Sequence, residues 1–188
     1  MVVLASLILS QPLASQYISS RFLWLVQGRG RLLDLNSVRI RRVREEDFQQ
    51  IVEIEKSAFP NPYPVGYLRF LAKGSRSTFL VAEDDSGIAG FIIADVRRRG
   101  EGHIVSIAVK ERVRRRGIAK RLMEAATSEL RERGAKFIKL EVRSTNLPAI
   151  NLYHSLGFRD VGVIYGYYRD GEDAISMIAD MDDLEGST

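Results

Sequence analysis

A single carboxylate interrupts an apolar stretch of the chain. Residues 137–142 read Phe-Ile-Lys-Leu-Glu-Val, a pattern that predicts a strand with Glu141 near its end. Burial disfavours the charged form of a carboxyl group and raises its pKa, which would make Glu141 a usable general base acting through a water molecule. The alternative interpretation is a structural glutamate that pairs with an arginine such as Arg143.

A run of basic residues lies between a predicted strand and a predicted helix. Arg114, Arg115 and Arg116 are followed by Gly117 and by the small residue Ala119. A helix N-terminus has unpaired N–H groups and partial positive charge, so it suits an anionic phosphate. Because cations are unfavourable there without an anion, we expect a pyrophosphate site rather than a solvated basic turn. The spacing fits neither a P-loop nor the dinucleotide-binding glycine fingerprint, which argues against nucleotide hydrolysis and hydride transfer.

The composition excludes several other kinds of site. The 188 residues include no cysteine and only two histidines, His103 and His154. Disulfides, thiolate-bound metals, a cysteine nucleophile and a multi-histidine metal site are therefore ruled out. A net charge of +4 favours an anionic ligand without requiring nucleic acid. The length fits one domain with a full hydrophobic core.

Hydrophobic periodicity predicts alternating strands and helices that would position these residues. Strands are expected at 38–43, 78–83, 87–96, 102–110, 135–143, 158–165 and 174–181, and helices at 45–58, 65–73, 117–133 and 147–156. Three prolines make a rigid turn at 59–64, before the second helix. The expected fold class is an α/β sheet with helices on both faces.

Several segments resemble those of GNAT acetyltransferases. The R-x-x-G-x-A pattern at 114–119 is similar to the acetyl-CoA motif of that family, and LEVRSTNLPAINLYHSLGF at 140–158 resembles its second diagnostic half. HIVSIAV at 103–109 and GYYRDGEDA at 166–174 resemble the central strand and the substrate loop of protein N-terminal acetyltransferases. The resemblance covers about 38–181 and is closest to the archaeal, RimI-like enzymes.

The resemblance implies the GNAT fold and acetyl-CoA as the acetyl donor, with CoA as the product. That fold has a mixed, mostly antiparallel sheet of about seven strands, splayed between the fourth and the fifth. Backbone groups of the central strand would hold the pantetheine arm, and the basic turn would hold the pyrophosphate. The implied cofactor-binding residues are Ile107, Ala108, Val109, Arg114, Arg115, Arg116, Gly117, Ile118, Ala119, Lys120, Asn146 and Tyr153.

The resemblance also implies direct acetyl transfer to an amine, with Glu141, His103 and Tyr153 as the catalytic residues. His103 lies where related enzymes have a second base, and a neutral imidazole accepts a proton near pH 7; a structural histidine is the alternative. Tyr153 follows Asn146 by two helical turns, and its phenol would protonate the departing thiolate unless it is simply a packed aromatic.

The implied substrate is the free α-amine of a protein N-terminus, including nascent chains at the ribosome. Tyr63, Tyr167 and Tyr168 are expected to clamp this substrate, because exposed tyrosines mark contact surfaces. Eukaryotic relatives have a Pro-Glu-Asn-Tyr turn where this chain has Pro-Asn-Pro-Tyr at 60–63. The missing glutamate suggests a relaxed preference that covers small first residues such as Ser and Ala, and also methionine.

Two other functions stay open at this point. One is a GNAT enzyme that acts on lysine side chains or on a small amine. The other is a ribosome- or RNA-binding module that uses the basic segments 97–99 and 112–116, although these lack interleaved aromatic residues. We expect a cytoplasmic enzyme, a monomer or weak homodimer, with no metal, no membrane and no specific nucleic acid as partner.

The first 37 residues differ from the rest. We expect a non-catalytic extension at 1–37, a GNAT domain at 38–181 and a C-terminal tail at 182–188. The apolar run at 2–9 is too short to span a membrane. The extension would pack on the domain, contact an oligomer partner or the ribosome through Trp24 and its apolar neighbours, or reflect an upstream, mis-assigned start codon.

Overall fold

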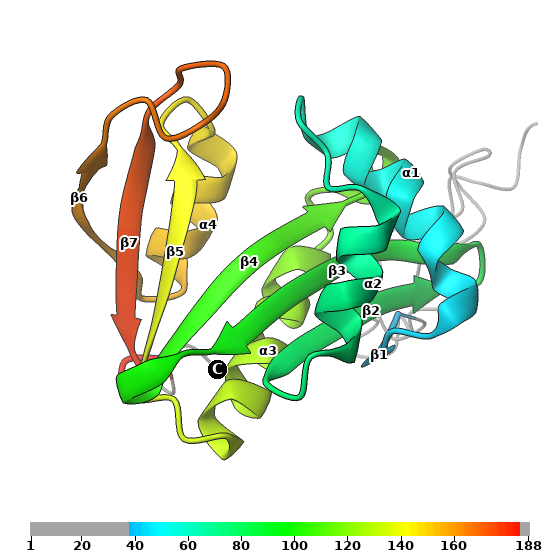
Figure 1. The fold of residues 1–188 in the computed structure, drawn as a ribbon, viewed down its shortest axis with the longest axis horizontal. Coiled ribbons are helices and arrows are strands. Elements are labelled where there is room, and N and C mark those ends of the chain that lie inside the picture. The colour runs from blue at the N-terminus through cyan, green and yellow to red at the C-terminus, as the bar shows by residue number, and fades with distance from the viewer. Residues whose placement is uncertain (1–37, 185–188) are drawn as a thin grey trace, which may run out of the picture. The chain divides into compact units, whose positions relative to one another are not determined.

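A computed structural model describes residues 38–184 as one seven-stranded sheet with four α-helices (Figure 1). The strands are β1 (Arg39–Arg42), β2 (Ser77–Asp84), β3 (Gly87–Val96), β4 (Glu101–Val109), β5 (Phe137–Arg143), β6 (Arg159–Ile164) and β7 (Ala174–Asp180). The helices are α1 (Phe48–Ala58), α2 (Val65–Lys73), α3 (Ile118–Glu132) and α4 (Leu147–Ser155). The expected extension at 1–37 and the last four residues of the expected tail lie outside the described residues.

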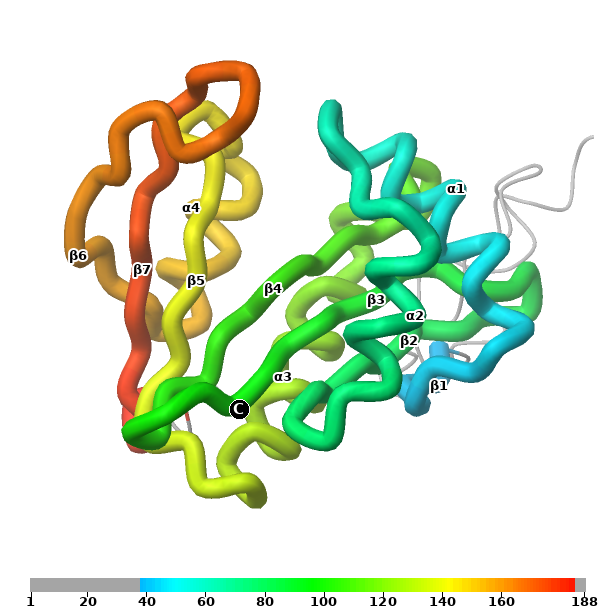
Figure 2. The backbone as a smooth tube through the Cα atoms, viewed as in Figure 1, coloured from blue at the N-terminus to red at the C-terminus, as the bar shows by residue number. Residues whose placement is uncertain are grey.

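The sheet has the strand order β1-β2-β3-β4-β5-β7-β6, and every neighbouring pair is antiparallel except β4 and β5. The parallel ladder between β4 and β5 has three residue pairs, from Glu101 opposite Phe137 to His103 opposite Lys139. Beyond it the two strands diverge, as Figures 1 and 2 show. The expected splay between the fourth and fifth strands is therefore confirmed.

Helices cover both faces of the sheet, as expected (Figure 1). The front face of β2–β4 is the one covered by α1 and α2, and the back face is the one covered by α3. α1 and α2 pack on a front-face core that includes Phe48, Ile51, Ile54, Leu68, Phe79, Phe91 and Ile93. On the back face, α3 buries Ile118, Leu122, Met123, Ala126 and Leu130. This packing fixes β4 as a rigid edge of the splay.

Helix ends coincide with breaker residues in the sequence. The carbonyl of Pro64 accepts the amide hydrogens of Tyr67 and Leu68, which starts α2 directly after the proline turn. Gly117 has a left-handed backbone with φ of 72°, and α3 starts at the next residue. The expected strands and helices all occur within two residues of their expected bounds, except that a 3₁₀ turn at Glu45–Asp47 precedes α1. Among residues 38–184, no helix is long and apolar enough to cross a membrane.

Candidate active site

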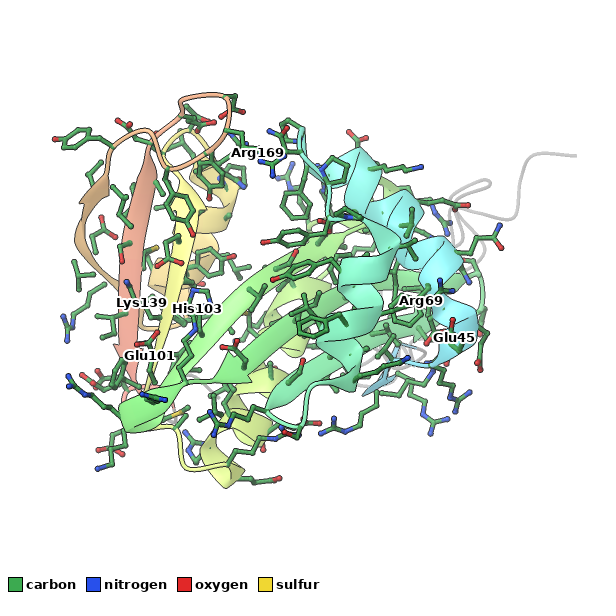
Figure 3. All side chains as sticks on the ribbon, in the orientation of Figure 1. Glu45, Arg69, Glu101, His103, Lys139 and Arg169 are labelled. Carbon is green, nitrogen blue, oxygen red and sulfur yellow. The ribbon has the colours of Figure 1, made fainter. Side chains whose placement is uncertain are left out.

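His103 and Glu141 meet where β4 and β5 separate; Figure 3 labels His103 there, beside Lys139. His103 Nε2 lies 2.8 Å from Glu141 Oε2, and both side chains are at least nine-tenths buried. Alternation along β4 places His103 on the front face together with Val105, which packs against the core under α1 and α2. The two residues expected to act as bases therefore form one hydrogen-bonded unit on the front face.

The hydrogen bonds around His103 define its tautomer. Arg97 Nη2 lies 2.8 Å from His103 Nδ1, and a guanidinium group can only donate. Nδ1 must therefore accept, so a neutral imidazole carries its proton on Nε2 and donates it to Glu141. In this arrangement neither ring nitrogen of His103 has a lone pair free to take a proton. The Glu141 carboxylate is the group of the pair that can accept one.

The pKa of Glu141 is lowered, not raised as the sequence suggested. The hydrogen bond from His103 stabilises the carboxylate more than burial disfavours it, and Lys139 Nζ, 3.3 Å from Glu141 Oε1, adds to the stabilisation. Burial alone would raise this pKa, and these two partners outweigh it. Glu141 is therefore ionised in the resting protein at neutral pH.

Arg143 ties the loop between β6 and β7 to the end of β5. Its guanidinium forms ion pairs with Asp170, at 2.9 Å, and with Glu172. It also lies 4.0 Å from the centre of the Tyr168 ring, a favourable cation–π distance. Arg143 is thus the partner of this loop rather than of Glu141, so the alternative of a Glu141–Arg143 ion pair is wrong.

Tyr63, before α2, and Tyr167 and Tyr168, between β6 and β7, influence one another's ionisation. Burial and the nearby charge of Glu141 raise the pKa of Tyr167, while burial, Tyr67 and Tyr167 all raise the pKa of Tyr63. Tyr168 packs edge-on against Tyr167 with the ring centres 5.1 Å apart, and burial raises the pKa of Tyr168 to about 12. Of the three tyrosines expected to clamp the substrate, Tyr167 and Tyr168 pack together and are influenced by the charge of Glu141, while Tyr63 is influenced by Tyr167.

The basic turn presents backbone donors at the start of α3. Gly117 and Arg115 have left-handed φ values of 72° and 61°, and no described side chain caps the helix. A Cβ placed on Gly117 would meet no heavy atom within 4 Å, so the space around it is open. Arg114 and Arg115 are exposed, while the side chain of Ile118 is buried and anchors the first turn. Donors, open space and cations together fit an anionic diphosphate.

The other expected cofactor contacts lie at the end of β4 and the start of α4. Residues 107–109 lie beyond the ladder with β5, and the carbonyl of Val109 accepts a hydrogen bond from Arg114 Nε at 3.2 Å. This bond ties the basic turn to β4. Asn146 caps α4, since its Oδ1 accepts the amide hydrogen of Ala149 at 3.3 Å. The amide NH₂ group of Asn146 is the part of that side chain suited to a ligand.

Comparison with known proteins decides the family. Residues 48–158 match the acetyltransferase (GNAT) family. The chain belongs to the GNAT acetyltransferase family. The N-alpha-acetyltransferase of Sulfurisphaera tokodaii is 40% identical over 153 residues, which cover 75% of this chain and 92% of the relative.

Solved GNAT structures agree with this assignment. The crystal structure of Ard1 from Thermoplasma volcanium matches with a TM-score of 0.73 at 29% identity, over 77% of this chain and 97% of that one. A chain of the NatC complex bound to Gag peptide and CoA matches with a TM-score of 0.68 at 25% identity, over 77% of this chain and 98% of that one. The protein is an N-alpha-acetyltransferase of the GNAT family.

Tyr153 of this GNAT domain lies on α4, buried against Phe158 with ring centres 5.8 Å apart. Burial raises the pKa of its phenol well above the ordinary value, and Tyr168 is its nearest titratable influence. A raised pKa keeps the phenol protonated and makes it a still weaker acid relative to a thiol, for which the cysteine side chain, with a pKa of about 8.5, is the reference. The packed-aromatic interpretation fits this geometry, and the role of proton donor stays a prediction.

Sequence reasoning missed three charged residues around the GNAT site: Glu55, Arg97 and Lys139. Glu55 is 2% exposed; its Oε1 accepts the amide hydrogen of Tyr63 at 3.1 Å, its Oε2 has no hydrogen-bond partner, and burial raises its pKa. Its position four residues after Ile51, on the apolar face of the helix, was the available signal. Arg97 stands out in the sequence only as part of a basic segment, and Lys139 does not stand out at all. Their partners, His103 and Glu141, nevertheless lie only six and two residues away along the chain.

Proposed function

We propose that this protein transfers acetyl from acetyl-CoA to the free α-amine of protein N-termini, with Glu141 as the general base. The observation that supports this most is the Glu141 carboxylate held by His103 at the splay of β4 and β5. Tyr167 is close enough to Glu141 for the carboxylate to raise its pKa, and Tyr63 is influenced by Tyr167 in turn. The arrangement offers an anionic acceptor with phenol groups near it, which suits an incoming ammonium group and the peptide attached to it.

Acetyl-CoA, when bound, supplies a thioester carbonyl that an amine can attack. The N–H groups of residues 118–120 and the side chains of Arg114, Arg115 and Arg116 would hold its pyrophosphate. Backbone groups of 107–109 and the amide of Asn146 would hold the pantetheine arm. A backbone N–H of β4 would also polarise the carbonyl oxygen.

The lowered pKa of Glu141 favours an α-amine over a lysine side chain. An α-ammonium group has a pKa of about 7.7–8.0, so a modest base suffices to release its proton near neutral pH. The ammonium of lysine, with a pKa of about 10.4, would require a much stronger acceptor. Glu141 would take the proton through a water molecule, while Arg97 and His103 hold it in place.

Tyr153 completes the proposed reaction as the proton donor to the leaving thiolate. Its raised pKa keeps it protonated in the resting protein, so its O–H can donate a hydrogen bond to the sulfur as negative charge develops there, while full proton transfer to the thiolate is uphill. Tyr63, Tyr167 and Tyr168 would bind the substrate backbone through their hydroxyl groups and cover the first side chain. We infer a preference for small first residues such as Ser and Ala, together with Met. Residue 61, an exposed asparagine, adds no acidic group to this pocket.

The proposed setting is the cytoplasm, where nascent chains present their N-termini. In this proposal residues 38–181 form the catalytic domain, and the segments 1–37 and 182–188 take no part in the chemistry.

A peptide panel tests the proposed function. Purified protein is incubated with acetyl-CoA and peptides that begin Ser, Ala, Met-Leu or Met-Glu, each with a free or a blocked N-terminus. Thiol release measures turnover, and mass spectrometry locates the acetyl group. We expect acetyl on the α-amine of the free peptides only. Acetylation of lysine in the blocked peptides, at comparable rates, would contradict the proposal.

A further inference from the structure

A row of aromatic rings leads away from the candidate active site. Tyr63 packs against Tyr67 with ring centres 5.0 Å apart, and Tyr67 stacks on Phe70 at 6.2 Å. The exposed fractions rise along the row, from 36% at Tyr63 to 42% at Tyr67 and 69% at Phe70. Tyr67 and Phe70 are three residues apart on α2, so they share one helix face. Contiguous exposed aromatics of this kind mark a binding surface.

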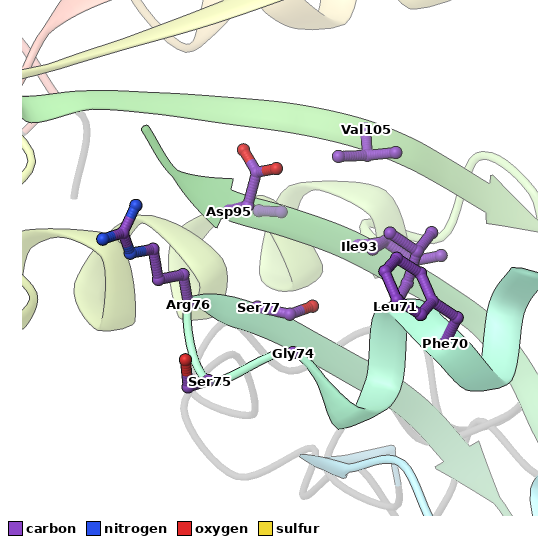
Figure 4. A pocket seen from close by; sticks show the side chains of 10 residues that line it. Phe70, Leu71, Gly74, Ser75, Arg76, Ser77, Ile93, Asp95 and Val105 are labelled. Carbon is purple, nitrogen blue, oxygen red and sulfur yellow. The ribbon is translucent and has the colours of Figure 1, made fainter. Parts of the chain in front are cut away.

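The far end of this row borders a cavity of about 250 Å³ between the C-terminal end of α2 and the strands β3 and β4 (Figure 4). Phe70, Leu71, Ile93 and Val105 form its apolar lining. Its polar lining comes from Arg76, Ser77 and Asp95. An apolar cavity with a polar edge suits one side chain of a bound polypeptide together with its backbone.

Residues that line the cavity are neighbours of the His103–Glu141 unit. Asp95 lies opposite His103 in the register of β3 and β4, and Val105 is two residues beyond His103 on the front face. Arg97 links the two regions, because its Nη2 lies 2.8 Å from His103 Nδ1 and its Nε lies 3.3 Å from Asp95 Oδ1. One set of charges therefore connects the floor of the cavity to the base.

Two polar atoms in the cavity wall lack a hydrogen-bond partner. These atoms are Ser77 Oγ and Asp95 Oδ1, and both are buried. Arg97 Nε is close enough to Asp95 for an ion pair but does not meet the geometry of a hydrogen bond. Polar atoms left unpaired in this way cost stability.

The spacing fixes which part of a substrate would reach the cavity. Asp95 lies opposite His103 in the β3–β4 ladder. His103 in turn lies opposite Lys139 in the β4–β5 ladder, two residues before Glu141. Strands lie about 4.8 Å apart, so Asp95 at the cavity is two strand spacings, roughly 10 Å, from β5, which carries the base. An extended chain advances about 3.3 Å per residue. The third or fourth residue of a polypeptide whose α-amine faces Glu141 would therefore lie over the cavity.

We propose that this groove, formed by Tyr67, Phe70, Val105 and Asp95, binds the substrate polypeptide downstream of the residue that is acetylated. The side chain of the third or fourth substrate residue enters the cavity, and an apolar side chain is preferred there. The inference rests on the proposed function, since it requires the α-amine to lie at Glu141. It adds a determinant of specificity beyond the first two residues of the substrate.

Peptide length and composition test this proposal. Six-residue peptides that begin Ser-Ala carry either Leu or Asp at positions three and four, and a Ser-Ala dipeptide amide serves as the short reference. We expect kcat/KM to be about tenfold higher for the Leu peptide than for the Asp peptide. Phe70→Asp should remove that preference and lower the ratio of long-peptide to dipeptide kcat/KM about tenfold. Val65→Asp, at another exposed apolar residue of α2, is the matched control.

Two outcomes would overturn the groove while leaving the proposed function standing. One is dipeptide acetylation with no difference between Leu and Asp peptides. The other is a dimer, seen by light scattering, that Phe70→Asp converts to a monomer, because the surface would then bind a second copy of the chain. Failure to acetylate the dipeptide and both long peptides on the α-amine would instead defeat the proposed function itself.

Discussion

The front face at the splay and the basic turn at the start of α3 are built from different kinds of contact. On the front face, Arg97, His103, Glu141 and Lys139 form a chain of side-chain hydrogen bonds and ion pairs. At the start of α3, the turn at 114–117 offers backbone donors and exposed arginines. Moving a proton requires acceptors in fixed positions, which buried side chains provide. Holding a diphosphate requires only donors and positive charge, which a helix N-terminus provides from its backbone.

This difference predicts which substitutions matter on each side. Single side-chain changes on the front face should impair turnover or substrate binding selectively. Near the basic turn, changes to the backbone or to the charge at Gly117 should impair acetyl-CoA binding selectively.

Glu141→Gln should lower kcat about 10³-fold, within the range typical of a lost general base. The amide keeps the shape of the side chain but cannot accept the proton. Acetyl-CoA affinity, measured by isothermal titration calorimetry, should change less than twofold. Glu132→Gln, at an exposed position of α3, is the control. Unchanged kcat would remove Glu141 from the reaction and turn attention to His103.

Gly117→Glu should weaken acetyl-CoA binding about 100-fold, because it puts a negative charge where the diphosphate is expected. Glutamate is also strained at a φ of 72°. Gly117→Asn is therefore a second control, because asparagine adds a side chain of similar kind without the charge and tolerates this backbone conformation. Gly162→Glu, at an exposed glycine of β6, is the control for added charge. Calorimetry that shows full affinity in Gly117→Glu would refute the diphosphate site.

Arg143→Gln should raise KM for peptides about tenfold with little change in acetyl-CoA affinity. The substitution breaks the ion pairs to Asp170 and Glu172 and leaves those carboxylates facing each other without a cation. The loop that carries Tyr167 and Tyr168 would then lose its anchor to β5. Arg159→Gln, which removes only an exposed pair on β6, is the control. An effect on kcat alone would contradict a role in substrate binding.

His103→Leu should change how stability depends on pH. The folded-state pKa of Glu141 is lowered, so Glu141 contributes stability above its unfolded pKa of about 4.3 and loses it as the pH falls through the folded value. Leucine removes the main cause of that shift. The gap in unfolding free energy between wild type and variant should therefore be largest above about pH 5 and narrow below pH 4. A gap that stays constant from pH 7 to pH 3 would show that His103 does not set the ionisation of Glu141.

The extent to which the sequence predicts this site depends on the range of the contacts involved. Glu141 and the basic turn stand out locally, because a carboxylate in an apolar strand and arginines before a helix are visible within ten residues. The lowered pKa of Glu141 is not visible in this way, since His103 lies 38 residues away and Arg97 acts through it. Local pattern thus identifies the reacting groups, and only the fold shows what tunes them.

The bounds of the helices and strands can also be predicted from local sequence patterns. Periodicity and breakers such as Pro64 and Gly117 give their bounds, because both act within a few residues. The role of Glu55 required the fold, since its partner is the backbone of Tyr63 in the turn after the helix. The groove along α2 also required it, because Phe70, Asp95 and Val105 come from three separate elements.

The brief parallel ladder between β4 and β5 also determines how the molecule opens. Three residue pairs join a half-sheet of β1–β4 to a half-sheet of β5–β7, whereas β2, β3 and β4 are joined to one another along most of their length. Amide hydrogens of β5–β7 should therefore exchange with deuterium as one cooperative unit, at a lower free energy of opening than those of β2–β4. A substrate that contacts both half-sheets would slow that exchange by holding them together.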